Sequence, residues 1–580
     1  MSKATTLRRY ETATEEKAGG VTYTPKPLAD FVARQILQVC TQTNKTTPLR
    51  ILDPAVGHGE LLISIVEQLR TQTDRLLHIY GFETDDAALA TAVTRLRTQF
   101  SNIEIDIQHA NFLEYVVENF NDTTDNDLFQ KTSPEKFDLI IANPPYVRTQ
   151  IMGGKQAQLL TEQFNLSGRV DLYHAFILGM SRVLATDGVA GIIVSNRFMT
   201  TRSGASVRTM LRDKMNIQHV WDLGDTKLFD VAVLPAVLLL AGKQHPKKIA
   251  PIFTSIYATQ DVEEDVTTTP LEAVTKNGVI RISDGRKFRV RHGTLDTSNN
   301  SDDVWRISSD ETDEWLETVR SKTYAKFSHI GKIRVGVKTC ADKVFIQADW
   351  HTFPKEEQPE LLRPLITHHT ARRYRANTTE KPWQILYTHE TVNGKRQVVD
   401  LSRFPKSEAY LTQHKMALED RRYVLEAGRQ WYEIWVPQDP SRWEAPKLVF
   451  RDISERPVFW IDQSGAVVNG DCYWITVDKC KNPDLLWLAV GIANSSFIEE
   501  FYDHRFNNKL YAGRRRFITQ YVEEFPLPNP ETNHAKRIIE LSKEAHELLS
   551  SNDAKAVELE HEIDKLVWLS FGLPIKEISG

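Results

Sequence analysis

Between residues 21 and 245, short apolar runs alternate with stretches in which apolar residues recur every three to four positions. The short runs predict buried β-strands, and the longer stretches predict amphipathic helices. The predicted strands cover 50–53, 78–83, 103–107, 137–142, 189–194, 219–223 and 236–241, and the clearest helices cover 61–69, 86–100 and 172–184. Such alternation is typical of a parallel sheet with helices on both faces, so we expect an α/β domain.

The pattern changes after residue 245. Residues 246–305 are rich in Thr, Asp, Asn and Gly, and we expect a bridging segment with short strands at most. Residues 306–530 carry many aromatic residues and arginines with mixed strand and helix signals, which indicates a second domain of mixed α/β type. Residues 531–580 predict Glu- and Lys-rich helices, and residues 1–20 predict a polar arm.

Composition adds few constraints. The chain has 580 residues, 41% of them hydrophobic and 26% charged, which is ordinary for a soluble protein of two to four domains. No apolar run is long enough to span a membrane, and the first residues lack the apolar core of a signal peptide. The four cysteines are scattered without CxxC spacing, so we expect neither a disulfide framework nor a metal site, and we expect a cytoplasmic protein. A net charge of −5 does not favour nucleic-acid binding, but local basic surfaces can still provide it.

A glycine-containing loop follows the first predicted strand. Residues 53–60 read Asp-Pro-Ala-Val-Gly-His-Gly-Glu, and Gly57 and Gly59 allow a tight turn and a close approach to a ligand. Glu83 ends the next strand, where a carboxylate can accept both hydroxyls of a ribose, although an incidental acid at a structural turn is the alternative. The spacing differs from GxGxxG, and no lysine follows Gly59 as in a phosphate loop. A ligand with ribose and adenine but no phosphate fits this loop better.

Asn111 and Phe112 follow the third predicted strand. The ring could stack on an adenine, and the side chain before it could hydrogen-bond the adenine amine. A core phenylalanine in a loop is the alternative, and these two residues taken alone favour that alternative.

Asn143-Pro144-Pro145-Tyr146 ends the fourth predicted strand. Two prolines stiffen the loop and remove two N–H donors, so the Asn143 side-chain oxygen and the Pro144 carbonyl remain as acceptors. Two acceptors on one –NH2 group localise the nitrogen lone pair and stabilise the positive charge that develops as the amine attacks. Tyr146 offers a flat face for stacking. The tetrapeptide therefore predicts transfer of a group to a planar amine.

Together these residues resemble the gamma-class N6-adenine DNA methyltransferases of type II restriction–modification systems, of the TaqI type. Three features carry the resemblance: loop 53–60 with Glu83, the tetrapeptide 143–146, and the position of segment 22–28 before both. The resemblance implies a Rossmann-like S-adenosylmethionine-dependent methyltransferase domain over 21–245 and a C-terminal mixed α/β DNA-recognition domain over 306–530.

The resemblance also implies an activity. A methyl group would pass from S-adenosylmethionine, which becomes S-adenosylhomocysteine, to N6 of a flipped-out adenine in duplex DNA, and this would protect the DNA of a bacterial host. No metal is implied. A cognate restriction endonuclease would share the DNA site without needing to bind, and the chain would act as a monomer or weak dimer.

The resemblance assigns roles residue by residue. The expected catalytic residues are Asn143, Pro144, Pro145 and Tyr146. The expected cofactor-binding residues are Thr22, Thr24, Pro25, Asp53, Ala55, Gly57, Gly59, Glu83, Asn111 and Phe112. Tyr146 and Phe229 are expected on opposite faces of the target base, although Phe229 alone would be interpreted as a core residue. Position 111 departs from the family, which usually has Asp there, so Asn111 can accept a hydrogen bond but offers no charge.

Three basic clusters in the C-terminal half are candidates for DNA contacts, because arginine binds phosphate or guanine. Their candidate residues are Arg372, Arg373, Arg375, Arg421, Arg422, Lys509, Arg514, Arg515 and Arg516. A solvated face remains the alternative for any one cluster.

Other acceptors and activities stay open. The tetrapeptide also suits cytosine N4, an RNA base or a protein glutamine, although enzymes of the last two kinds are usually short chains without a long recognition region. A fused nuclease or a non-catalytic specificity module is disfavoured, because the arm is short and the tetrapeptide is intact. The recognized DNA sequence does not follow from the amino-acid sequence.

Overall fold

The computed structural model describes residues 23–40, 47–120, 135–146, 162–164, 166, 171–229, 234–245, 250–298, 300, 303–377, 382–478, 482–506, 514–548 and 553–575. The chain divides into two compact units, residues 1–309 with 509–513 and residues 310–508 with 514–580. The expected arm 1–20 lies outside the described residues. In the described part of the chain, no helix is long and apolar enough to cross a membrane.

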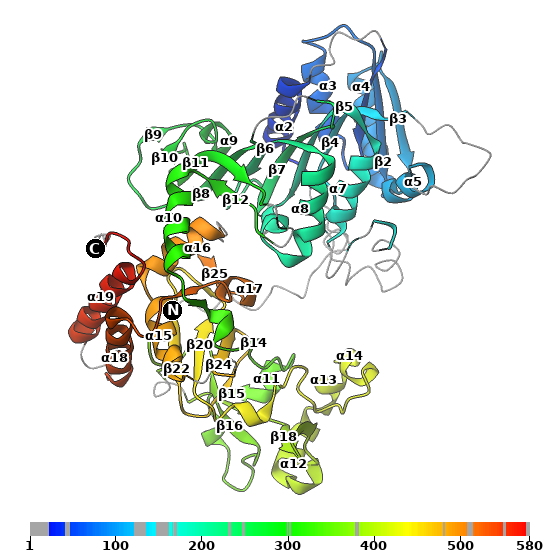
Figure 1. Ribbon diagram of the computed structural model, residues 1–580. Coiled ribbons are helices and arrows are strands. Elements are labelled where there is room, and N and C mark those ends of the chain that lie inside the picture. Colours follow the sequence, from blue (N-terminus) through cyan, green and yellow to red (C-terminus); the bar gives the residue numbers. More distant parts are fainter. Residues whose placement is uncertain are drawn as a thin grey trace, which may run out of the picture. The chain divides into compact units, whose positions relative to one another are not determined.

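The first unit is built on a twelve-stranded sheet (Figure 1). Its strands run in the order β3 (Glu104–His109), β2 (Leu77–Glu83), β1 (Leu49–Asp53), β4 (Phe137–Ala142), β5 (Leu184–Ser195), β7 (Pro235–Ala241), β6 (Asn216–Asp222), β8 (Ile252–Ala258), β11 (Lys287–Asp296), β10 (Gly278–Arg281) and β9 (Asp265–Val266), with β12 (Arg306–Ser308) beside β11. The strands from β3 to β5 pair in parallel, as the sequence pattern predicts.

Strand β7 departs from the expected parallel arrangement, because it pairs antiparallel with both β5 and β6. The connection from β6 to β7 spans only residues 223–234 and contains no helix in its described part. A parallel neighbour requires a long crossover connection, so this short connection returns the chain antiparallel.

Helices cover both faces of the sheet, as expected (Figure 1). Helices α2 (Lys26–Val39), α3 (Glu60–Leu69) and α4 (Asp86–Gln99) share one buried cluster, and α5 (Phe112–Asn119), α7 (Leu172–Val183) and α8 (Ala205–Lys214) share another. Strand β4 contributes to both clusters in alternation: Leu139 and Ile141 join the first, and Ile140 and Ala142 join the second. This alternation is the period-two pattern of a strand with both faces buried.

Residues 250–308 differ from the bridging segment that the composition suggests, because strands β8 to β12 extend the same sheet, and the short helix α9 (Pro270–Ala273) connects β9 to β10. In β11, buried Phe288 and Val290 alternate with the more exposed Arg289 and Arg291, so one face of the strand packs on the core. The polar residues of this segment lie on the outward face of the strands and in turns, so the composition of the segment did not indicate strands.

The second unit contains two four-stranded sheets around buried tryptophans, among them Trp443 and Trp474. One sheet has the order β14 (Ile333–Val335), β24 (Cys472–Thr476), β20 (Lys447–Arg451), β22 (Phe459–Asp462); the other has β15 (Ile346–Gln347), β17 (Gln384–Leu386), β16 (Leu362–Ile366), β23 (Val467–Val468). The short pairs β13 (Ala325–Lys326) with β26 (Pro526–Leu527) and β21 (Ile453–Ser454) with β25 (Arg515–Arg516) complete this unit together with the hairpin β18 (His389–Val392) and β19 (Lys395–Val398).

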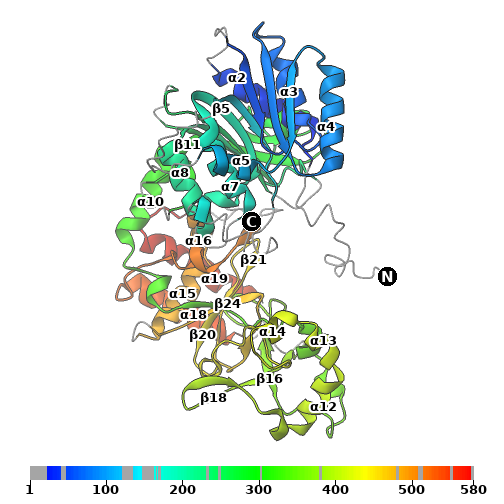
Figure 2. The ribbon, with the colours of Figure 1, turned by 90° about the vertical axis from the view of Figure 1, so that its right-hand side faces the viewer.

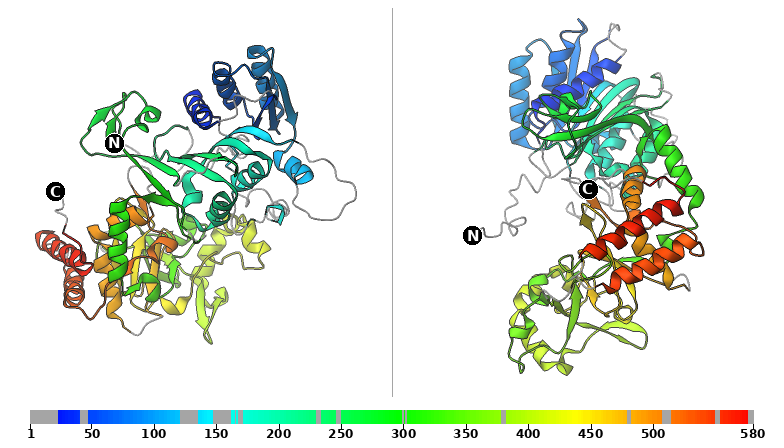
Figure 3. Two further views of the ribbon diagram at one scale, coloured as in Figure 1. Left: turned by 45° about the horizontal axis from the view of Figure 1, so that its top comes forward. Right: turned by 90° about the vertical axis from the view of Figure 1, so that its left-hand side faces the viewer.

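Helices surround these sheets. They are α10 (Asp310–Lys322), α11 (Asp342–Phe345), α12 (Pro405–Gln413), α13 (Lys415–Glu419), α14 (Arg422–Glu426), α15 (Asp484–Ala493), α16 (Ser496–Arg505), α17 (Thr519–Val522), α18 (Asn533–Glu547) and α19 (Asp553–Ser570). The helices expected near the C-terminus are α18 and α19, and they pack against α15 within this unit (Figure 3). Helices α12 to α14 and the hairpin β18–β19 lie apart from α18 and α19 (Figure 2).

Candidate active site

The carboxyl ends of the parallel strands bring the predicted site residues to one edge of the sheet. Asp53 at the end of β1 pairs in register with Gly81, and Glu83 at the end of β2 pairs with His109. Asn143 follows directly after β4. Ligands of open α/β sheets bind beyond this edge, so the predicted residues stand where such a ligand would be held.

The glycine loop is held in a left-handed backbone conformation. Gly57 has a φ of 53° and Gly59 a φ of 81°, values that side chains disfavour. One Glu83 carboxylate oxygen accepts the Gly57 N–H at 2.8 Å, and the other accepts the N–H groups of Thr84 and Asp85 at 2.8 and 2.9 Å. Glu83 therefore ties the loop to the end of β2.

An arginine that sequence reasoning missed also holds this loop. Arg95 on α4 donates to the carbonyl of His58 at 2.7 Å and forms an ion pair with Glu60 at 2.6 Å. Both contacts cross from α4 to the start of α3. No motif points to Arg95, because its partners lie more than thirty residues away in sequence.

Asp53 is buried beneath the loop. Its Oδ1 accepts the N–H of Ala55 at 3.0 Å, and its Oδ2 has no hydrogen-bond partner among the described residues. Burial raises the pKa of the Asp53 carboxyl to about 7. Ala55 lines a cavity over the ends of the strands, whereas Asp53 is not among the residues that line this cavity and shapes the turn.

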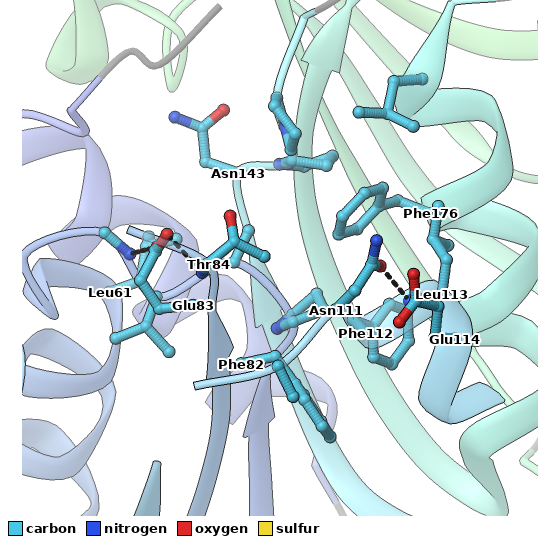
Figure 4. A pocket seen from close by; sticks show the side chains of 18 of the residues that line it. Leu61, Phe82, Glu83, Thr84, Asn111, Phe112, Leu113, Glu114, Asn143 and Phe176 are labelled. Atoms are coloured by element: carbon cyan, nitrogen blue, oxygen red, sulfur yellow. Dashed lines mark hydrogen bonds between the residues drawn. The ribbon is translucent and has the colours of Figure 1, made fainter. Parts of the chain in front are cut away.

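A cavity of about 560 Å³ lies over these strand ends (Figure 4). Glu83 and Thr84 line one side, and Asn111, Phe112 and Phe176 line the other (Figure 4). Its further lining residues include Tyr23, Thr24, Ala55, Gly57, His58, Phe82, Asn143, Pro144, Pro145 and Tyr146. Its volume is within the range of sites that enclose a small organic ligand.

Asn111 and Phe112 have structural contacts as well as a place in the lining. The Asn111 side-chain oxygen accepts the N–H of Leu113 at 2.9 Å and so caps α5. The Phe112 ring is almost fully buried between Phe82 and Phe176, with centroids 5.6 Å from each. The second lone pair of the Asn111 oxygen can still accept another donor.

The Asn143 amide is contacted at both ends. Its Nδ2 donates to Thr24 Oγ1 at 3.0 Å, and its Oδ1 accepts from the Tyr146 hydroxyl at 3.0 Å. Pro144 and Pro145 complete the same stretch of the lining. All four residues of the predicted tetrapeptide therefore face the cavity that contains Glu83.

Tyr146 and Phe229 are not brought together. Tyr146 packs against the cluster on the α5–α7–α8 face, with its ring 6.0 Å from Tyr173, and burial raises the pKa of its hydroxyl far above the ordinary value. Phe229 follows β6, is buried in the other cluster with Trp221 and Leu223, and is not among the cavity-lining residues. The expected pairing is therefore absent from this conformation, because the two rings belong to clusters on opposite faces of the sheet.

The segment before α2 contributes two residues to the site. Thr24 lines the cavity, whereas Pro25 is the N-cap of α2 and is not among the lining residues. Tyr23, which sequence reasoning missed, stacks on His58 with ring centroids 3.7 Å apart. Thr22 lies outside the described residues.

The candidate DNA-contacting arginines in the second unit fall into two groups. The exposed group comprises Arg372, Arg375, Arg422 and Arg514. Within the first cluster, Tyr374 is buried with a φ of 66°, and it anchors the segment by backbone hydrogen bonds to Phe459 and Ile461. Lys509 lies outside the described residues.

The other group makes contacts within the protein. Arg421 is buried and donates to the carbonyls of Leu418, Thr339, Glu433 and Trp431. Arg373 pairs with Glu560 at 2.6 Å, Arg515 pairs with Asp503 and Glu499, and Arg516 pairs with Asp452.

These contacts correct the expectation for Arg421 and Arg515, whose guanidinium groups support the fold. A buried guanidinium needs acceptors on all sides, and carbonyls or carboxylates provide them here. Glu499 and Asp503 lie one helical turn apart on α16. That spacing was the feature of the sequence that could have indicated an ion-pair partner for Arg515 within the protein.

No group of three or more His, Cys, Asp or Glu side chains within the described ranges could hold a metal ion.

Two protein families match parts of the chain. Residues 77–229 match the family described as Eco57I restriction-modification methylase, and residues 392–527 match the TaqI-like C-terminal specificity domain. The first match lies within the first unit and covers the Glu83 and Asn143 segments. The second match lies in the second unit apart from residues 509–513, and it includes Arg421 and Arg422.

Two curated relatives extend along most of the chain. The type II methyltransferase M.BanIII of Aneurinibacillus aneurinilyticus is 36% identical over 572 residues, which is 96% of this chain and 98% of that protein. The type II methyltransferase M.BstVI of Geobacillus stearothermophilus is 24% identical over 88% of this chain and 90% of that protein.

Among solved structures, the type IIL restriction-modification enzyme MmeI in complex with DNA has a similar fold. The TM-score is 0.60 at 14% sequence identity, over 95% of this chain and 75% of that chain.

Proposed function

The chain belongs to the type II methyltransferases of restriction–modification systems, and from this premise we propose that it methylates N6 of an adenine in duplex DNA with S-adenosylmethionine as donor. Its fold is the expected one, a Rossmann-like methyltransferase domain followed by a TaqI-like C-terminal specificity domain. The proposal rests above all on the Asn143 amide, which lines the same cavity as the Glu83 carboxylate.

The residues of the cavity fit S-adenosylmethionine. Glu83 offers carboxylate oxygens to a ribose diol, and the aromatic wall with Phe112 suits a purine. The Asn111 oxygen keeps one lone pair for an exocyclic amine, and the left-handed loop at Gly57 and Gly59 permits a close approach of the backbone. When bound, this cofactor supplies a methyl group made strongly electrophilic by a sulfonium.

Asn143 and Pro144 act on the acceptor amine. The Asn143 Oδ1 and the Pro144 carbonyl accept the two amine hydrogens, which localises the nitrogen lone pair and stabilises positive charge on that nitrogen. Tyr146 contributes a ring for stacking. Because burial raises the pKa of its hydroxyl, Tyr146 stays protonated, and the amine proton leaves to solvent.

Access to a base requires that it leave the helix, at a cost of a few kcal/mol. Contacts to the surrounding duplex must offset this cost, and the specificity domain is the part of the chain suited to make them. We assign phosphate or base contacts to the exposed arginines Arg372, Arg375, Arg422 and Arg514. Methylation of the site would protect host DNA from the endonuclease of the same system.

Adenine is favoured over cytosine by the order of segments. The cofactor loop and tetrapeptide 143–146 precede the specificity region, and the tetrapeptide starts with Asn, which together resemble the gamma class. No observation favours RNA or a protein amide over DNA.

Competing acceptors test the proposal directly. S-adenosylmethionine labelled with tritium in its methyl group is incubated with the chain and equal masses of duplex DNA, RNA and protein. We expect label in DNA from the wild type and none from Asn143→Ala. Asn102→Ala is the matched control, because Asn102 is exposed and far along the chain from the tetrapeptide. Label confined to RNA or protein would contradict the proposal.

A further inference from the structure

Thr24 contacts the side chain on which the proposed chemistry depends. Its Oγ1 accepts a hydrogen bond from Asn143 Nδ2 at 3.0 Å, across 119 residues of sequence. Both residues line the same cavity. A cofactor contact was the only role that the sequence suggested for Thr24, so this hydrogen bond adds a second connection.

Thr24 is held from both sides. On one side the Tyr23 ring stacks on His58, and on the other Pro25 begins α2, whose residues Leu28, Val32 and Ile36 are fully buried. The backbone carbonyl of Pro25 accepts the N–H groups of Leu28 and Ala29. The Thr24 hydroxyl is therefore a fixed partner rather than part of a loose end.

The polarity of the Asn143 amide makes this partner important. A carboxamide offers an oxygen that accepts and a nitrogen that only donates. An incoming amine brings hydrogens, so Oδ1 must face it and Nδ2 must turn away toward an acceptor. Thr24 Oγ1 is that acceptor here, while Tyr146 donates to Oδ1. Because Oδ1 has two lone pairs, the amine and the Tyr146 hydroxyl can use it together.

We propose that Thr24 is a positioning residue that keeps the Asn143 oxygen turned toward the acceptor amine, an inference that rests on the proposed function. Loss of the hydroxyl leaves Nδ2–H without this acceptor in the productive orientation. Without this hydrogen bond the amide is less restrained, and it turns or moves from the orientation that presents Oδ1 to the amine. The consequence falls on the transfer step, whereas a residue that only binds cofactor would affect its affinity.

The test separates these two roles by substituting Thr24→Val, which keeps the shape and removes the oxygen, and Thr24→Ser, which restores a hydroxyl. The kcat is measured at saturating cofactor and DNA, the KM for each is measured separately, and calorimetry measures cofactor affinity. We expect Thr24→Val to lower kcat about tenfold or more, with a smaller change in cofactor affinity and recovery of most of the loss in Thr24→Ser. Thr71→Val is the matched control, because Thr71 is exposed and its hydroxyl donates to the Gln68 carbonyl in its own turn.

A crystal structure of Thr24→Val gives a readout that needs no turnover. We expect the Asn143 amide to be rotated or displaced from the Tyr146 hydroxyl. An unchanged amide, or an unchanged kcat with a raised KM for cofactor alone, would overturn the inference. If the wild type methylates no DNA, the proposed function fails, and the crystal structure still decides whether Thr24 positions the amide.

Discussion

The buried histidine of α7 leads to a quantitative prediction about acid stability. His174 is 1% exposed, and neither ring nitrogen has a hydrogen-bond partner among the described residues. Burial, with the nearby positive charges of Arg197 and Arg208, lowers the pKa of His174 from 6.5 to about 4. Since Leu172 and Phe176 on the same helix line the cavity, the stability of α7 matters for the site.

The sign of the effect follows from proton binding. Between the two pKa values the unfolded chain binds a proton at this residue and the folded chain does not, so stability falls as the pH falls from about 6.5 toward 4. At about pH 5 the difference amounts to about 2 kcal/mol, and at about pH 7.5 it is close to zero. His174→Leu removes the titrating group. The difference in free energy of unfolding between His174→Leu and wild type should therefore shift by about 2 kcal/mol in favour of the variant when the pH is lowered from about 7.5 to about 5.

The assay is denaturant unfolding of wild type and His174→Leu at both pH values. His351→Leu, at an exposed histidine, is the control and should show no such pH-dependent difference. Equal stability changes for His174→Leu at both pH values would refute the argument.

Three further predictions concern Glu83, the pair Arg421 and Arg422, and Tyr146. Glu83→Gln should weaken S-adenosylmethionine binding about tenfold or more, because an amide cannot accept all the backbone N–H groups that the carboxylate accepts; equal affinity by calorimetry would contradict this. Arg421→Met should destabilise the chain by about 3 kcal/mol through unsatisfied carbonyls, whereas Arg422→Ala should leave stability unchanged and reduce the salt dependence of DNA binding by about one in log–log slope. Unfolding and DNA titrations would contradict this if Arg421→Met kept its stability and lost salt dependence while Arg422→Ala was destabilised. Tyr146→Ala should lose about tenfold more methylation rate than Tyr146→Phe, because only Phe retains a ring for stacking; equal rates in single-turnover assays would count against stacking.

Local residue types were sufficient to predict much of the site. The loop at Gly57 and Gly59 needed left-handed backbone, and glycine is the residue that permits it. The apolar run before Asn143 identified β4, and parallel strands bring their carboxyl ends to one edge. Glu83 and Asn143 could therefore be assigned to one cavity from strand order alone.

Long-range contacts could not be predicted in the same way. The Thr24–Asn143 hydrogen bond joins residues 119 apart, and no periodicity records it. Basic runs gave a wrong prediction where the fold surrounds the guanidinium with carboxylates or carbonyls from distant parts of the sequence, as at Arg421 and Arg515. Phe229 is buried in the cluster that contains Trp221, as the pattern alone indicated, whereas its expected place beside the target base came only from the resemblance.

The identity of the methylated nucleoside shows whether the chain methylates adenine or cytosine. Duplex DNA is incubated with S-adenosylmethionine and either the wild type, Asn102→Ala or Asn143→Ala, digested to nucleosides and analysed by mass spectrometry. We expect N6-methyladenine as the modified nucleoside with the first two proteins and none with Asn143→Ala. N4-methylcytosine in place of N6-methyladenine, or undiminished N6-methyladenine with Asn143→Ala, would contradict this expectation.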